Sequence, residues 1–357
     1  MPQQAIPFLF MRGGTSRGPF FDRSHLPEDL DDLAELLIKA VGSGHSLNID
    51  GIGGGAAVTT KVAMLSPSDD DWADIDYFFA QVGVEDRLVD YKPTCGNMLT
   101  AIGPAAIEMG MIEPGNETTE VRIRAVNTGA EVLSVVQTPG GVVEYQGDAA
   151  IDGVPGTAAP VQLNFRKVAG GATGHLLPTG NLRDEIDGID VTCMDVAMPV
   201  VMARADALGL TGHETREELD ANTGFFARIE AVRLKAGEAM GMGNVSNSVT
   251  PKFALLARAQ NAGSFAARYF MPWQTHPTLA VTGAQCIAAC ALAPGSIADG
   301  LWDRTNAAPA ALKIEHPSGL IDVIIDFSND ADGFHVASAG LTRTARKLAA
   351  GQLFVPD

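Results

Sequence analysis

The stretch "KPTCGNMLTAIGPAAIEMG", residues 92–110, predicts a central helix that begins beside a cysteine. Pro93 and Thr94 are typical of a helix entry, and residues 97–109 carry apolar or small side chains at helical spacing. Gly96 would let the backbone turn closely at that entry. Cys95 is therefore expected near free backbone N–H groups and the positive end of a helix dipole, both of which favour a thiolate. The alternative is a small core residue, since free cysteines are commonly buried.

Length and composition indicate a globular protein of two domains. The 357 residues exceed the size at which one core keeps growing, and 46% hydrophobic with 19% charged residues is typical of a globular chain. The formal net charge of −18, without a dense Lys/Arg run, disfavours nucleic acid as a partner. An acidic small molecule remains a possible ligand if cations gather locally.

The N-terminal segment and the cysteines favour a cytoplasmic protein with no membrane partner. "MPQQAIPFLFMRGG" lacks the basic and apolar regions of a signal peptide, and no apolar run approaches the roughly 18 residues of a membrane helix. Four scattered cysteines are too few for a disulfide framework. Cys286 and Cys290 lie in an apolar stretch without nearby His or acidic residues, which favours core thiols over a metal site.

Elements of the first half recur in order in the second half, which indicates an internal duplication. "TTKVAML" (59–65) matches "TPKFALL" (250–256) and places Lys61 opposite Lys252, an offset of 191 residues. "VRIRAVNTGAEVLSVV" (121–136) matches "LKIEHPSGLIDVIID" (312–326) at an offset of 190 residues. The Cys95 helix is matched by the apolar helix within residues 276–295.

Each repeat predicts an α+β unit in which β-rich hairpins enclose a central apolar helix. Alternating segments separated by turns favour strongly curved sheets over parallel βαβ units. The predicted domains are 1–184 and 185–340, with 341–357 returning to the first domain. We expect a small-molecule site in a cleft between two such halves.

Seven motifs together resemble the PrpF family, which has the diaminopimelate epimerase fold of two pseudo-symmetric α/β barrels, each around a central helix. They are "FMRGGTSRGPFF", "IDGIGGGAAVTTKVAML", "CGNMLTAIGPAAIEMG", "IDGVPGTAAPV", "LLPTGN", "HPSG" and "LTRTARKLAAGQLFVP". The resemblance implies isomerisation of a C=C bond in a small tricarboxylate without metal or organic cofactor. "IDGVPGTAAPV" and "LLPTGN" look most like the 4-oxalomesaconate isomerases and tautomerases of protocatechuate and gallate breakdown, which implies aromatic catabolism and lignin degradation. Methylaconitate is the alternative substrate.

The resemblance also implies a catalytic pair, Lys61 as general base and Cys95 as general acid or proton relay. Epimerases of this fold use two cysteines, whereas this sequence has Thr282 within "VTGA" at the second position, so a symmetric two-thiol mechanism is not expected. Charge that develops during a proton shift needs cations or N–H donors. The predicted substrate-binding residues are Thr15, Ser16, Arg17, Gly54, Gly55, Gly96, Asn97, Lys252, Thr282, Gly283, His316 and Ser318.

Other interpretations remain open at this level. Cys95 could be a nucleophile in acyl transfer with His45, His276 or His316 as its base, or the protein could be a non-catalytic binder of small anions. The acidic run "SPSDDDWADIDYFF" (66–79) lacks calcium-loop spacing and is expected to be a solvated helix start. A homodimer is a further expectation.

Overall fold

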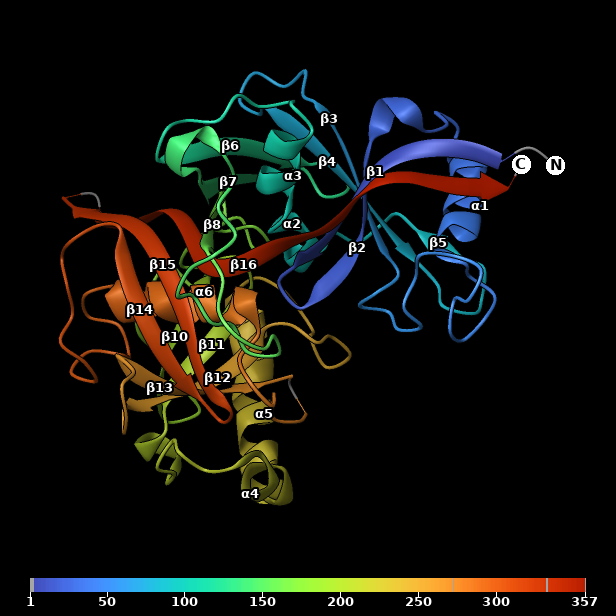
Figure 1. Ribbon diagram of the computed structural model, residues 1–357. Helices are drawn as coiled ribbons and strands as arrows, with labels where there is room; N and C mark the ends of the chain where they lie inside the picture. Colours follow the sequence, from blue (N-terminus) through green and yellow to red (C-terminus); the bar gives the residue numbers. More distant parts are fainter. Residues whose placement is uncertain (1–2, 272, 332, 357) are drawn as a thin grey trace. The chain divides into compact units, whose positions relative to one another are not determined.

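The computed structural model describes residues 3–271, 273–331 and 333–356 (Figure 1). The chain forms two compact units, one of residues 1–165 with 342–357 and the other of residues 166–341. The first boundary therefore lies at residue 165, not at 184. The reason is that the Gly170 N–H donates to the Asp195 carbonyl and Ala169 bridges to Val196, so the segment after residue 165 already belongs to the second unit.

The first unit contains a sheet that closes on itself, because the strand at the end of its order also pairs with the first strand. Its elements are β1 (Gln3–Gly13), β2 (Ser16–Asp22), η1 (Arg23–His25), α1 (Leu30–Val41), β3 (Lys61–Pro67), β4 (Ile75–Val82), β5 (Val89–Asp90), α2 (Gly96–Leu99), α3 (Ile102–Glu108), β6 (Thr118–Ala125), β7 (Ala130–Gln137), η2 (Pro139–Gly141) and β8 (Pro160–Arg166). The order β1-β2-β3-β4-β6-β7-β8 continues to β16 (Gly333–Pro356), which also pairs with β1. Because α2 contacts β1 and β2 while α3 contacts β3, β6 and β7, the sheet wraps these two helices.

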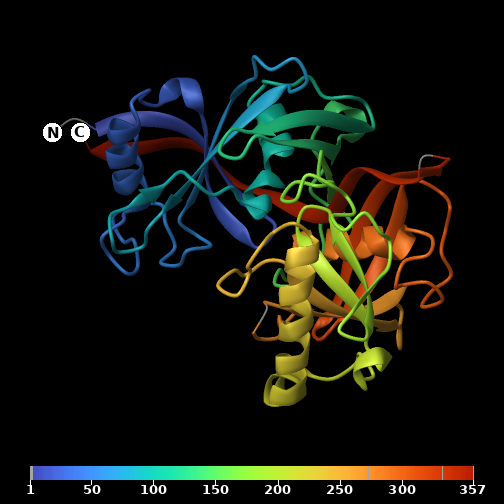
Figure 2. The same ribbon diagram turned by 180° about the vertical axis from the view of Figure 1, so that it is seen from behind.

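The second unit repeats this plan around one longer helix. Its elements are β9 (Asp184–Ile186), β10 (Ile189–Asp195), β11 (Pro199–Arg204), η3 (Asp206–Leu208), α4 (Arg216–Ala221), α5 (Thr223–Ala239), β12 (Lys252–Arg258), β13 (Phe265–Phe270), α6 (Val281–Leu292), β14 (Ala310–His316) and β15 (Gly319–Asp330), and the first part of β16 pairs with β15. The helix α6 contacts β10 and β11 as well as β14 and β15, so strands from both ends of the order curve around it (Figure 2).

The predicted duplication is confirmed by the pairing pattern. In the first unit β2 pairs with β3, and β4 with β6, in parallel; in the second unit β11 pairs with β12, and β13 with β14, in parallel. Lys61 and Lys252 each begin the corresponding strand. The α+β class and the curved sheets around central helices are as the sequence predicts.

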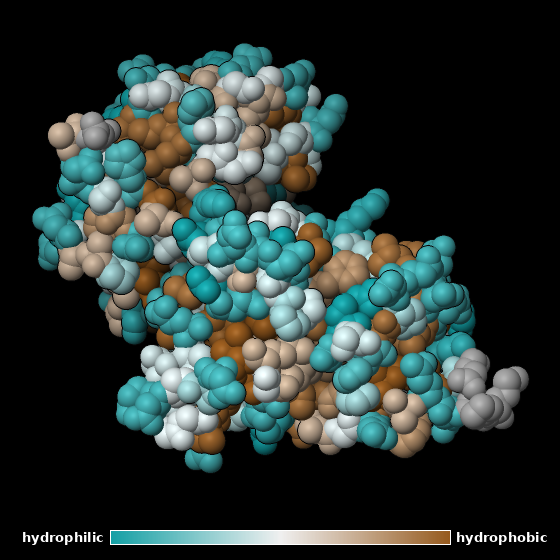
Figure 3. Space-filling model, turned by 90° about the horizontal axis from the view of Figure 1, so that it is seen from above, coloured by the Kyte–Doolittle hydropathy of each residue, from teal (hydrophilic) through white to brown (hydrophobic). Residues whose placement is uncertain are grey.

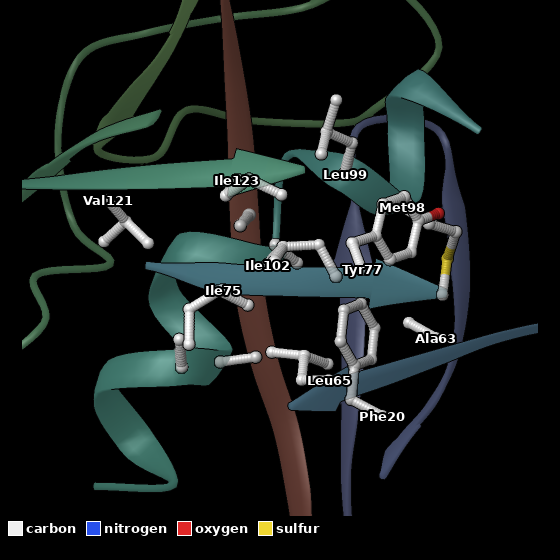
Figure 4. Packing of buried hydrophobic residues seen from close by; sticks show 14 of the residues in the cluster. Phe20, Ala63, Leu65, Ile75, Tyr77, Met98, Leu99, Ile102, Val121 and Ile123 are labelled. Carbon is white, nitrogen blue, oxygen red and sulfur yellow. The ribbon is translucent and has the colours of Figure 1, made fainter. Parts of the chain in front are cut away.

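The central helix of the first unit is broken into two segments, α2 and α3, where the sequence predicts one. Pro104 explains the interruption, because it has no N–H to donate to the carbonyl of Thr100 and its ring would clash with that carbonyl. Met98, Leu99 and Ile102 from these helices pack against Tyr77 and the other buried side chains of the surrounding strands (Figure 4).

The acidic run at 66–79 does not begin a helix, so that prediction is wrong. Its second half is the start of β4, because the alternating and aromatic sequence "IDYFFAQV" suits a strand. The carboxylates instead pair with arginines of β6: Asp74 with Arg122, and Asp76 with Arg124.

Cys286 and Cys290 are core thiols, as expected, and Cys193 is a third one. Cys193, Cys286 and Cys290 are fully buried, and burial raises the pKa of Cys193 and of Cys290 to about 12. These thiols are therefore protonated at neutral pH.

In the view of Figure 3, hydrophilic side chains alternate with small apolar areas. Among the described residues, every helix is too short or too polar to cross a membrane.

Candidate active site

The turn between β1 and β2 lies against the start of α2. The Thr15 N–H donates to Asn97 Oδ1 at 3.4 Å, and Asn97 Nδ2 donates to Thr15 Oγ1 at 3.0 Å. Gly13 and Gly14 permit this approach, because a Cβ on either would overlap Asn97, and Gly14 also has a φ of +49°. Close approach thus depends on these two glycines and not on Gly96, beside which a Cβ would meet nothing within 4 Å.

Cys95 occupies the cap position immediately before α2 and is half-buried. Its carbonyl accepts the Leu99 N–H at 2.8 Å and the Tyr77 hydroxyl at 3.4 Å. Burial first, and the charge of Cys95 second, raise the pKa of Tyr77 well above its usual value, so this hydroxyl keeps its proton and acts as a donor. Since α2 has only four residues, few aligned peptide groups contribute to a dipole at Cys95.

The Lys61 amine is held by Gln81, the residue directly opposite it on β4. Lys61 Nζ donates to Gln81 Oε1 at 2.6 Å and lies 5.3 Å from the centre of the Phe79 ring. Gln81 Nε2 faces three acceptors, Ala57 O at 3.1 Å and Thr60 Oγ1 and Val82 O at 3.2 Å. These acceptors fix the amide orientation, so the carbonyl oxygen must point at the lysine.

Two aromatic residues connect the surroundings of Lys61 and Cys95. Tyr77 and Phe79 are alternate residues of β4, so their side chains lie on one face, and their ring centres are 6.3 Å apart in an edge-to-face arrangement. Phe79 contacts the Lys61 amine, while Tyr77 contacts the Cys95 backbone. The Lys61 amine and the Cys95 backbone thus approach the same aromatic pair. Sequence reasoning missed Tyr77, Phe79 and Gln81, although their period-two spacing marks one face of a strand.

Ser16 and Arg17 lie on opposite faces of β2. Ser16 is 2% exposed, and its hydroxyl has no hydrogen-bond partner among the described residues. Arg17 is exposed, its guanidinium lies 5.6 Å from the Phe10 ring centre, and its backbone N–H donates to Val58 O at 3.0 Å. A Cβ on Gly54 would be 2.9 Å from Arg17 Nη2, so Gly54 leaves room for the guanidinium, and Gly55 turns the loop with a φ of +72°.

The other predicted binding residues belong to the second unit, where Gly283 lies against Tyr269. Its ring lies 6.0 Å from that of His276, and a Cβ on Gly283 would overlap it. Burial first and the nearby Arg233 second lower the pKa of Lys252, and burial is the main cause of the lowered pKa of His276, with the charge of Lys252 contributing.

Ser318 ties its turn to the same region. Ser318 Oγ donates to Pro277 O at 2.6 Å, and its N–H donates to His316 Nδ1 at 3.2 Å. Thr282 is the second residue of α6, next to Gly283. His45 lies in the first unit, where its Nδ1 accepts the Leu47 N–H at 3.2 Å within a turn. In the described part of the chain, no three His, Cys, Asp or Glu side chains cluster as possible metal ligands.

The fold and full-length similarity define the class of protein. The family model described as "PrpF protein" matches residues 3–356, so the chain belongs to the PrpF family, and its relatives make it an isomerase with the diaminopimelate epimerase-like fold.

Particular relatives match over nearly their whole length. The Escherichia coli K12 protein YbhH, named as a candidate isomerase, is 49% identical, with 98% of this chain and 99% of the relative covered. The (4E)-oxalomesaconate Delta-isomerase of a Novosphingobium species is 43% identical, with 98% of each chain covered. The crystal structure of a methylitaconate-delta-isomerase superposes with a TM-score of 0.89 at 32% identity, covering 99% of this chain and 96% of that one.

Proposed function

We propose that this protein moves a C=C bond by a 1,3-proton transfer in an unsaturated tricarboxylate, 4-oxalomesaconate, without a cofactor. The single observation that carries the proposal is the approach of the Lys61 amine and the Cys95 backbone to one aromatic pair, because an allylic shift needs one base and one acid near the two ends of a three-carbon system. The 43% identity to a (4E)-oxalomesaconate Delta-isomerase supports this substrate.

In the proposed reaction, the Lys61 amine removes a proton from the saturated carbon of the allyl system. The C–H electron pair becomes the new C=C bond, and the old π pair takes a proton from the Cys95 thiol at the far carbon. One C–H bond breaks and one forms, so the substrate gains and loses no atoms or electrons. A conjugated carbonyl or carboxylate carries the transient charge, and the buried Ser16 hydroxyl can donate to it.

The return of protons completes the cycle. Lys61 leaves the reaction as an ammonium and Cys95 as a thiolate, so a proton must pass back between them or through solvent before the next turnover. Tyr77 stays protonated and continues to hold the backbone of Cys95.

A second candidate is a smaller methyl-branched unsaturated acid, such as methylaconitate. The TM-score of 0.89 to a methylitaconate-delta-isomerase supports it, because methylitaconate is also a small methyl-branched unsaturated acid. The chemistry assigned to Lys61 and Cys95 would be unchanged.

Proton NMR in heavy water tests the function with each acid as substrate. We expect exchange at both ends of the allyl system of 4-oxalomesaconate, and a loss of at least about 100-fold in kcat for Lys61→Met and for Cys95→Ser, the usual loss when a general acid or base is removed. Lys313→Met, at an exposed position of β14, is the matched control and should keep full activity. Circular dichroism verifies folding. Full activity of folded Cys95→Ser would reject the proton-relay role.

A further inference from the structure

A cavity of about 730 Å³ lies within the first unit, on the outer side of the β1–β2 hairpin. We call it the hairpin pocket, and three segments line it: Arg12 and Arg17 of the hairpin, residues 145–148, 151 and 154–158, and residues 344 and 346–348 of β16. Four of its lining side chains are basic and one, Asp148, is acidic. The net charge of the pocket lining is therefore positive, whereas the net charge of the whole chain is −18.

Three arginines form a row across neighbouring strands of this pocket. Arg12 of β1 pairs directly with Arg17 of β2 and with Arg346 of β16. Directly opposed residues project from the same face of a sheet, and like charges in such positions destabilise it. Burial first and the charge of Arg346 second lower the pKa of Arg12, as expected for a guanidinium beside another cation.

The contacts of the row leave its charge largely uncompensated. Arg12 Nη1 donates to neutral oxygens, the Gly14 carbonyl at 2.9 Å and the Thr344 carbonyl at 2.8 Å. Arg17 lies over the Phe10 ring. The fourth cation, Lys347, is paired with Glu108 at 2.5 Å. Neighbouring like charges retained in an acidic protein indicate an anionic ligand.

The pocket adjoins the candidate active site through Thr15. A Cβ on Gly153, in the loop that forms one wall of the pocket, would lie 3.1 Å from the Thr15 methyl group. Thr15 is hydrogen-bonded to Asn97, two residues after Cys95. Thr15, in the turn of the hairpin, thus joins the pocket to the helix start that bears Cys95, although the arginine row and Ser16 lie on opposite faces of the hairpin.

We propose that the row of Arg12, Arg17 and Arg346 binds the carboxylates of the substrate that lie remote from the reacting carbons. This inference rests on the proposed function. Planar guanidinium groups suit the task, because each can donate two parallel hydrogen bonds to one carboxylate.

Calorimetry with tricarballylate, a saturated tricarboxylate that cannot isomerise, tests the pocket without turnover. We expect Arg346→Gln to weaken tricarballylate binding by about tenfold or more, the effect of losing a charge-assisted hydrogen bond. The matched control is Arg258→Gln, at an exposed position of the second unit, which should bind like the wild type. Arg346→Lys keeps the charge and should recover part of the affinity, which separates lost charge from lost folding.

The competing outcomes are distinct. Equal tricarballylate affinity of wild type and Arg346→Gln, or inorganic phosphate binding as tightly as tricarballylate, would overturn the inference. With 4-oxalomesaconate, Arg346→Gln should raise KM and leave kcat nearly unchanged. If the wild type does not isomerise this acid but Arg346→Gln still loses tricarballylate binding, the proposed function is rejected. The conclusion that the arginine row binds a tricarboxylate is then retained. If wild type and Arg346→Gln isomerise 4-oxalomesaconate normally and with equal KM, the inference about the pocket is rejected and the proposed function stands.

Discussion

At the scale of single residues, the best-defined feature is the fixed amide of Gln81. Three acceptors hold its Nε2, so its oxygen is aimed at the Lys61 amine at 2.6 Å. Ordering the flexible lysine side chain costs rotamer entropy, and the hydrogen bond to the fixed amide offsets this cost. The amine is thereby kept beside the Phe79 ring. Gln81 is thus a positioning residue rather than a group that touches the reacting atoms.

Changing Gln81 to Met should lower kcat about tenfold with little change in KM, since it misplaces a base without removing a substrate contact. Steady-state kinetics measure both constants, and kcat and KM values equal to those of the wild type would contradict this positioning role.

At the scale of elements, ion pairs fix the parallel alignment of β4 and β6. Asp74, just before β4, accepts the Arg122 backbone N–H at 2.9 Å and the Arg122 guanidinium at 2.5 Å. The Asp74 N–H in turn donates to the Arg122 carbonyl at 2.8 Å. Parallel strands lack a tight hairpin to set their register, so contacts of this kind help to define it.

Asp74→Asn should make the Tm of the protein less dependent on pH than the Tm of the wild type. The Arg122 hydrogen bond is the main cause of the lowered pKa of Asp74, so the stabilisation is present above the carboxyl pKa of the unfolded chain and is lost as pH falls through the folded one. We expect a Tm a few degrees below the wild type at pH 7 and a smaller difference near pH 3. Asp71→Asn, at an exposed position in the same loop, is the control. A Tm difference that does not depend on pH would contradict this account.

At the scale of the whole molecule, the chain leaves the first unit and returns to it. Residues 342–357 belong to the first unit, although they follow residues 166–341, which make up the second unit. The end of β16 pairs with β1 from Gln3↔Pro356 to Gly13↔Ala345, with one register shift at Phe10/Met11. Val355 and Ala345 are buried in its cores.

Deleting residues 342–357 should unfold the first unit, because β1 would lose a partner along its length and become an exposed edge. The expected result is the loss of one thermal transition and of all activity. A synthetic peptide of residues 342–356 should restore part of both, whereas Gln352→Ala, at an exposed position of β16, should be neutral. Calorimetry provides the measurement, and an unchanged melting profile of the truncated protein would show that the returning strand is dispensable.

Sequence alone determined the repeated strand and helix plan, the buried thiols and the placement of Lys61 on a strand and Cys95 at a helix start. These features follow from local periodicity, which specifies which face of an element is apolar. The resemblance of the motifs gave the family. Pro104 lies within the predicted helix, yet helical periodicity alone does not indicate the break between α2 and α3.

Only the tertiary structure placed Gln81 opposite Lys61, Tyr77 beside Cys95 and Arg346 beside Arg12. Each of these contacts depends on strand register and on the order of strands in the sheet. Burial of the whole core and long-range pairing set both, and a slip of one residue would move every side chain to the other face. The arginine row joins residues from opposite ends of the chain, where no local pattern connects them.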